Sequence, residues 1–109
     1  MLPNEWFNFT PILLASKSRS YRESVTKQCA SLVTFLFEKS ILKINPLDDN
    51  GVIKRDLTIL KDDLTEAGQY LFTSGAIYKW LEFTDNGGKI DNFKRLEKAL
   101  FEFEKSQDS

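Results

Sequence analysis

One stretch of the chain decides the fold, and over residues 20–42 it reads SYRESVTKQCASLVTFLFEKSIL. Apolar side chains recur there at helical spacing, from Tyr21 through Val25 to Leu36, which is the pattern of an amphipathic α-helix. Further apolar residues on neighbouring positions widen the stripe beyond a single face. We therefore expect a central helix that packs on two sides.

Local signals predict the ends of this helix. Ser20 and Glu23 have the spacing of a capping box, in which each side chain satisfies a free amide of the first turn. The apolar pattern continues to about Leu42. Asn45-Pro46 follows, and proline disfavours helical geometry in the residue before it. The helix is therefore expected to run from Ser20 to about Leu42.

The C-terminal half predicts three shorter helices. Thr65 is placed to cap the first of them, and Gly75 permits a break at its end. A second helical piece is expected over residues 76–84, before a glycine-rich turn. Asp91 is expected to cap the third, over residues 92–105, where one face is apolar and the remainder is charged.

Two other segments are less regular. Residues 1–15 are rich in large apolar side chains and predict two short helical turns. Residues 52–60 fit either a helix or a strand, and a small hairpin pairing 41–44 with 52–60 stays open. The expected fold is mainly α, a compact bundle of four to six helices in a single domain (residues 1–109), with room for a small β-hairpin near residues 41–60.

The chain has no histidine and one cysteine. Histidine is the commonest general acid–base and metal ligand, and it is the usual activator of a serine or cysteine nucleophile. Cys29 falls on the apolar stripe of the first helix, so we expect it to be buried and unreactive. We expect no enzymatic activity, no cofactor and no metal.

The net charge of −1 hides an asymmetry between the two halves of the chain. Residues 1–55 carry eight Lys/Arg and five Asp/Glu, whereas residues 56–109 carry seven and eleven. The acidic half suits a basic partner. Nucleic-acid binding needs a concentrated basic face, so no nucleic-acid partner is expected.

Membrane insertion and secretion are not expected either. The most apolar run, residues 29–44, contains Glu38 and Lys39 and is too short to span a bilayer. The first residues lack the basic and apolar segments of a secretory signal. We expect a cytoplasmic protein that does not bind membranes.

Carboxylates give the chain its candidate site. Three pairs stand close in the sequence: Asp48 with Asp49, Asp62 with Asp63, and Glu82 with Asp85. An enzyme could use such pairs, but turn and helix-start chemistry already explains the first two. Tyr78 and Trp80 face different sides of a helix, so one of them is expected to be exposed beside these acids. The residues predicted to contact a partner are Asp62, Asp63, Glu66, Tyr78, Glu82 and Asp85.

The stretch from residue 63 to residue 100 carries a recognisable pattern. Its residues are Leu64-Thr65-Glu66-x-Gly68, Lys79-Trp80-Leu81, Asp85 and Leu96-Glu97-Lys98-Ala99-Leu100. The pattern resembles small bacterial proteins of toxin–immunity loci, including immunity proteins of contact-dependent growth inhibition. This resemblance implies an immunity or antitoxin-like protein that neutralises a cognate toxin by direct contact. The implied toxin is basic, as a nuclease would be.

A rival hypothesis is a small helix-turn-helix DNA-binding regulator built from residues 65–86. Its second helix, residues 76–84, would have to read the major groove. That segment has Lys79 as its single basic residue and also carries Glu82. A recognition helix needs Arg, Lys, Asn or Gln towards the base edges, so this hypothesis ranks second.

Overall fold

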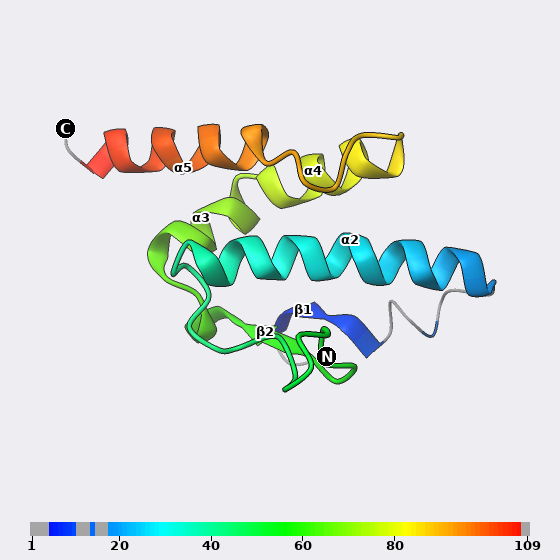
Figure 1. Ribbon diagram of the computed structural model, residues 1–109. Helices are drawn as coiled ribbons and strands as arrows, with labels where there is room; N and C mark the ends of the chain where they lie inside the picture. Colours follow the sequence, from blue (N-terminus) through cyan, green and yellow to red (C-terminus); the bar gives the residue numbers. More distant parts are fainter. Residues whose placement is uncertain (1–4, 11–13, 15–17, 108–109) are drawn as a thin grey trace.

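A computed structural model describes residues 5–10, 14 and 18–107 of the chain. The molecule measures 48 × 30 × 28 Å along its principal axes, and Figure 1 shows its elements. In chain order they are β1 (Glu5–Asn8), α2 (Arg19–Glu38), β2 (Thr58–Leu60), the 3-10 helix η1 (Lys61–Asp63), α3 (Glu66–Thr73), α4 (Ala76–Asp85) and α5 (Lys94–Gln107). The expected mainly α fold is confirmed.

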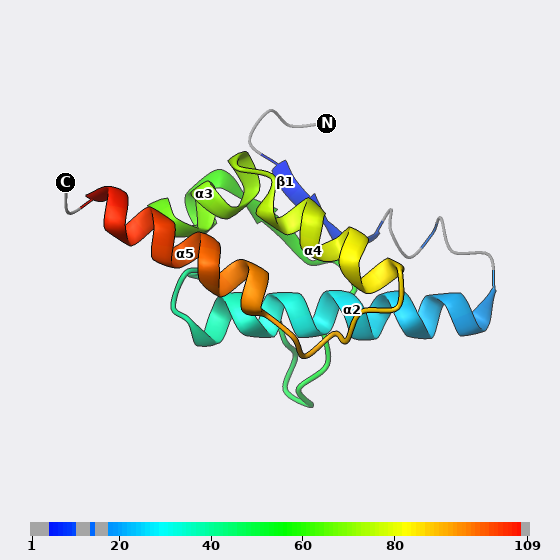
Figure 2. The same ribbon diagram turned by 90° about the horizontal axis from the view of Figure 1, so that it is seen from above.

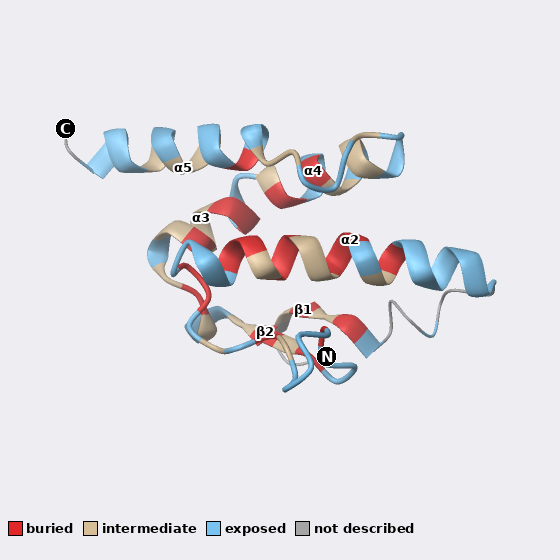
Figure 3. Ribbon diagram, viewed as in Figure 1, coloured by how far each residue is buried: buried red, intermediate tan, exposed pale blue. Residues whose placement is uncertain are grey.

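Helix α2 lies in the middle of the molecule. The β1–β2 sheet and its connecting loops cover one side of it, and α3, α4 and α5 cover the other (Figures 1 and 2). The second half of α2 is largely buried, whereas its first turns are exposed (Figure 3). The prediction that this broad apolar stripe packs on two sides is therefore confirmed.

The start of α2 differs from the prediction. The helix begins at Arg19, and the hydroxyl of Ser18 accepts a hydrogen bond from the Tyr21 amide at 3.1 Å. Ser18 is thus the N-cap, and the expected capping box of Ser20 and Glu23 is wrong. Ser18 and Ser20 are both suitable capping residues by type, but Ser18 has the extended backbone that an N-cap needs.

The end of α2 also comes earlier than expected. Ser40 takes a left-handed backbone with φ 61°. The amide of Ser40 donates to the Phe37 carbonyl and the Ile41 amide to the Leu36 carbonyl, each at 3.0 Å. This pair of bonds is the Schellman motif that ends many helices. Ile41 and Leu42 are buried after the turn, so their apolar character belongs to the core and does not extend the helix.

Strand β1 takes the place of the first of the two helical turns predicted for residues 1–15, whereas Phe9, Thr10 and Leu14, which follow it, are helical. Residues 5–8 pair with β2 in antiparallel fashion, in the register Glu5↔Leu60, Phe7↔Ile59 and Asn8↔Thr58, with an irregularity between Glu5 and Phe7. Phe7 is buried within β1, and Phe9, directly after the strand, is buried too. Residues 1–4, 11–13 and 15 of this predicted segment lie outside the described residues.

The pairing of residues 41–44 with 52–60, which the sequence leaves open, does not form: β2 pairs with β1, and Leu42 forms a bridge with Leu64 instead. A smaller antiparallel turn forms instead, closed by a single bridge between Leu47 and Ile53. The Asp48 carboxylate accepts bonds from the amides of Asn50 (2.8 Å) and Val52 (3.0 Å). The turn chemistry expected for the Asp48–Asp49 pair is therefore confirmed at Asp48.

The three C-terminal helices match their predictions closely. Thr65 caps α3 by accepting a bond from the Gly68 amide at 3.3 Å. Gly75 separates α3 from α4 with φ 83°, a left-handed conformation that glycine takes without steric cost. At the start of α5 the amide of Lys94 donates to the side chain of Asn92 at 3.2 Å, so Asn92 and not Asp91 satisfies the first turn.

All of these elements share one core. Its largest fully buried members come from the residue directly after β1, from α2, from the 41–64 connection and from every later helix: Phe9, Leu32, Leu36, Leu42, Ile59, Leu64, Leu71, Ile77, Trp80 and Leu96.

Candidate functional site

Helix α4 is held in the molecule by one side and presents the other to solvent. Ile77 and Trp80, three residues apart, are both buried in the core. The Trp80 indole donates a hydrogen bond to the Asn92 carbonyl at 2.9 Å and stacks on the Phe93 ring at 5.5 Å. These contacts fix the rotation of α4, and thereby fix which side chains it exposes.

Three of the predicted contact residues lie on the exposed side of α4. Tyr78, Glu82 and Asp85 stand at positions i, i+4 and i+7, which share one face of an α-helix. All three are exposed, and Tyr78 exposes 61% of its surface. Trp80 is fully buried, so the prediction that the two aromatic residues face different sides is confirmed.

A shallow pocket lies beside Tyr78. It has a volume of about 250 Å³ and is lined by Trp6 of β1, by Phe72 and Thr73 of α3, and by Tyr78 itself. The Trp6 and Phe72 rings meet at a tilt, with centroids 5.8 Å apart. Tyr78 therefore stands at the edge of an aromatic hollow, and an apolar side chain of a partner would lose water on several sides there.

The other three predicted residues lie elsewhere. Asp62 and Asp63 are in η1, and Glu66 is the first residue of α3. Figure 1 places the β2–α3 junction at one end of the molecule, while α4 runs away from it. The six residues thus form two separate acidic groups and no continuous patch.

Two of the six carboxylates also have structural partners. Asp63 accepts a hydrogen bond from the Leu60 amide at 2.9 Å, which ties η1 to β2. Asp85 accepts one from the side-chain amide of Gln28 at 3.0 Å, which joins the end of α4 to α2. Asp62, Glu66 and Glu82 are exposed and make no such contact among the described residues.

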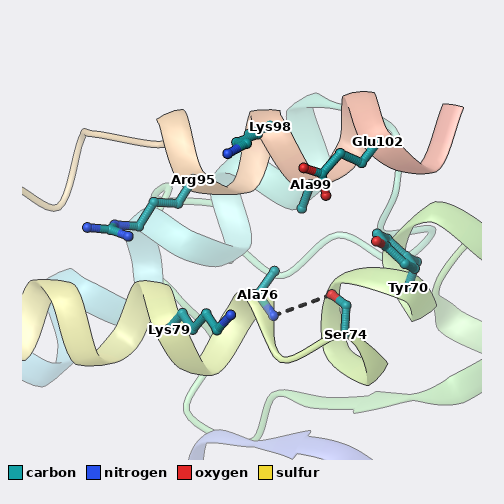
Figure 4. Close-up of a pocket in the computed structure, with 8 residues that line it drawn as sticks. All are labelled: Tyr70, Ser74, Ala76, Lys79, Arg95, Lys98, Ala99 and Glu102. Atoms are coloured by element: carbon teal, nitrogen blue, oxygen red, sulfur yellow. Dashed lines mark hydrogen bonds between the residues drawn. The ribbon is translucent and has the colours of Figure 1, made fainter. Parts of the chain in front are cut away.

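A cleft of about 280 Å³ lies on the opposite flank of α4, between this helix, α3 and α5 (Figure 4). Lys79 projects into it from α4, and Arg95 and Lys98 from α5, with Tyr70 and Glu102 at one end. Within residues 18–107, no ion pair joins any of these three cations to a carboxylate.

The cleft continues along α4. Lys79 and Arg95 also line a second hollow of about 540 Å³, together with Glu82, and this hollow reaches Phe83 and the turn at Gly87-Gly88. The Arg95 guanidinium lies over the Phe83 ring, 5.0 Å from its centroid, in a cation–π contact that orients it. Sequence patterns did not predict this cationic cleft, because its residues come from separate helices and meet only in the folded chain.

Cys29 is the one cysteine of the chain and its candidate nucleophile. Cys29 is buried, as predicted. Burial raises the pKa of its thiol from 9.0 to about 11, and the negative charge of Asp85 adds to the shift. In the part of the chain that the structure describes, no three Cys, Asp or Glu side chains gather in a way that could hold a metal ion. No described helix is long and apolar enough to cross a bilayer.

Comparisons with known proteins add no relative to this picture. No family model matches the chain, no curated protein is similar to it, and no solved structure matches its fold.

Proposed function

We propose that this chain is a binding protein of the immunity or antitoxin kind, which neutralises a basic toxin by direct contact and performs no chemistry of its own. One observation carries the proposal: the fold buries Trp80 and leaves Tyr78 exposed on the same helix, one turn before Glu82. A well-fixed tyrosine is a typical binding hot spot, because it buries a large area with little loss of side-chain freedom.

The chemistry of the surroundings supports a protein partner. The aromatic hollow beside Tyr78 offers a place for an apolar anchor. Glu82 is exposed, and a carboxylate at the rim of an interface attracts a basic partner and speeds its association. The pattern of residues 63–100, which resembles immunity proteins, contains this helix.

The test is capture of the partner with the tagged chain and with Tyr78→Ala/Glu82→Lys. The wild-type chain is expected to retain one stoichiometric basic protein whose toxic or enzymatic activity falls on binding. The double variant should weaken that complex at least tenfold, since it removes a hot spot and reverses a rim charge.

The matched control is Glu38→Lys, an exposed acid at the end of α2 that lies on no part of this surface. It should leave the affinity unchanged. A partner that binds both variants as tightly as the wild-type chain, with the same salt dependence, would show that α4 is not the contact surface.

The cationic cleft favours a second candidate, the small DNA-binding regulator. Lys79, Arg95 and Lys98 could meet phosphates without first breaking an ion pair. Against this candidate, Glu82 and Asp85 on the same helix would face the DNA backbone. Binding of a labelled duplex by the wild-type chain at moderate salt, abolished in Lys79→Glu/Arg95→Glu, would favour the regulator. Flow-through on heparin would argue against it.

A further inference from the structure

The cationic cleft between α3, α4 and α5 brings together three positive side chains (Figure 4). Lys79 reaches it from α4, and Arg95 and Lys98 reach it from α5. In the described part of the chain none of the three forms an ion pair, and Glu102 is the single carboxylate among the lining residues. Three cations and one carboxylate leave a charge of +2. Like charges that share one cleft repel each other, so the cleft favours an anionic ligand.

The Arg95 guanidinium is already oriented in the free protein. It lies over the Phe83 ring, 5.0 Å from the centroid. This ring packs on Gly88, where a Cβ would come within 2.5 Å of the ring atoms, so glycine leaves the space that the ring fills. The planar fork of an arginine matches two oxygens of one oxyanion. A fork that is oriented in advance loses less freedom when the ligand binds.

Hydroxyl groups and apolar carbon complete the lining of the cleft. The Ser74 hydroxyl oxygen accepts a hydrogen bond from the Ala76 amide at 3.4 Å, which leaves its own hydrogen for a ligand. The Tyr70 ring lies at the same end as Glu102, and the methyl groups of Ala76 and Ala99 lie between that end and the cations (Figure 4). The lining therefore suits an anion that carries a small organic part.

The positive charge ends at a carboxylate in both directions. Glu102 stands one turn after Lys98 on α5. In the other direction, the second hollow carries Glu82 beside Lys79 and Arg95. The backbone of a nucleic acid repeats its charge at short intervals and would run past both carboxylates. One compact anion fits between them.

We propose that the cationic cleft binds a small phosphate monoester, with the phosphate among Lys79, Arg95 and Lys98. Such a phosphate carries about −1.5 to −2 charges at pH 7, which balances the +2 of the cleft. The volume of about 280 Å³ is close to the lower end of ligand pockets, roughly 300–1,000 Å³, so the ester is a small one. The inference does not depend on the proposed function, since Tyr78 does not line the cleft.

The experiment is isothermal titration calorimetry of the full chain with AMP, adenosine and inorganic phosphate at one low ionic strength. AMP represents the ester, adenosine its organic part alone and inorganic phosphate the anion alone. At about pH 8 the ester is a dianion, because its second pKa is about 6. AMP is expected to bind one to one, and adenosine at least tenfold more weakly, because it lacks the charged group that the three cations contact.

A pair of double variants with equal charge tests the position of the site. Lys79→Gln/Lys98→Gln removes two of the three cations and should weaken AMP binding at least tenfold. The matched control Lys43→Gln/Lys54→Gln removes the same charge at two exposed positions that line neither hollow, and it should bind AMP like the wild-type chain. Circular dichroism checks that both variants keep their helices.

A third variant tests the orientation of Arg95. Phe83→Leu keeps every charge but removes the ring beneath the guanidinium, and AMP binding should weaken at least threefold. A general attraction of anions to a positive surface would not respond to this change.

Three results would overturn the proposal. One is a wild-type chain that binds neither AMP nor inorganic phosphate up to about 10 mM. Another is equal weakening in the two lysine double variants. The third is a short DNA duplex that binds at least tenfold more tightly than AMP and is lost in Lys79→Gln/Lys98→Gln, which would assign the cleft to nucleic acid. Equal affinity for AMP and inorganic phosphate would support the phosphate site and identify free phosphate as its source.

Discussion

The two halves of α2 differ in almost every physical respect. Every residue from Arg19 to Ser24 is exposed, whereas seven side chains between Val25 and Leu36 are buried. The first half is stabilised locally, by the Ser18 cap and by the exposed Arg19–Glu23 ion pair. The second is stabilised by the sheet on one side and by the later helices on the other. One continuous helix thus combines a locally stabilised arm with a tertiary core.

This difference explains how a small domain can keep an exposed surface on its longest element. An isolated helix of a few turns is only marginally stable in water. The exposed arm stays helical because it continues a helix that the core already stabilises. The arm places Arg19 and Arg22, followed one turn later by Lys27, along the edge of a groove of about 410 Å³ that residues 52–55 line on the other side. Substitutions in the two halves should therefore differ in kind and in size.

The largest effect is expected in the buried half. Leu36→Ala removes a fully buried side chain and should lower the free energy of unfolding by about 2–5 kcal/mol, the range for a truncated core leucine. The neighbouring Phe37 is 39% exposed, and Phe37→Ala should cost clearly less. Urea denaturation of both variants measures the difference. Equal losses would mean that the helix is not packed on two sides.

The next effect concerns Cys29. At pH 8 a thiol with a pKa of about 11 is ionised about 100-fold less than one at 9.0, so its reaction with a disulfide reagent should be at least that much slower in the folded chain than in urea. The contribution of Cys29 to stability should be fully present below about pH 9 and be lost as pH rises towards 11, since the thiol releases its proton first in the unfolded state. Rapid labelling of the folded chain would show that the buried half opens readily.

A smaller effect separates the two serines at the start of α2. Ser18→Ala removes the N-cap and should cost about 1 kcal/mol of stability. Ser20→Ala should be neutral or slightly stabilising, because alanine is a better helix former. Thermal unfolding compares the two variants. A larger loss in Ser20→Ala would restore the capping box that the sequence suggests.

The smallest effect is expected for the exposed ion pair. A double-mutant cycle on Arg19 and Glu23 should give a coupling of about 0.3 kcal/mol that disappears in high salt, as for other exposed i,i+4 pairs. A coupling well above this would show that the arm has a more rigid structure than its exposure suggests.

Sequence patterns predicted the helices well where the signal is local. The α3 cap at Thr65 and the break at Gly75 depend on chemistry within one turn, and both were correct. The partner of β2 could not be predicted in this way, because pairing with residues 5–8 depends on the whole chain being folded. The end of α2 was misjudged because Ser40 takes a backbone conformation that usually signals glycine.

The candidate site shows the same division. The period of α4 sufficed to predict that Tyr78 and Trp80 face different sides. It did not predict which acids would gather, since Asp62 and Glu82 are brought to different ends by the path of α3 and α4. The cationic cleft needs the packing of α5 against α4, and no pattern within either helix encodes it.

The long-range pairing of β1 has a consequence for folding during synthesis. Thr58 of β2 lies fifty positions after Asn8 of β1, which at about 5–20 residues per second corresponds to several seconds of synthesis. During that interval the first strand has no edge to join, while the helix that follows it can already form. The contact of Trp6 with Phe72 can form only after α3 has been synthesised, so this contact marks the end of that interval.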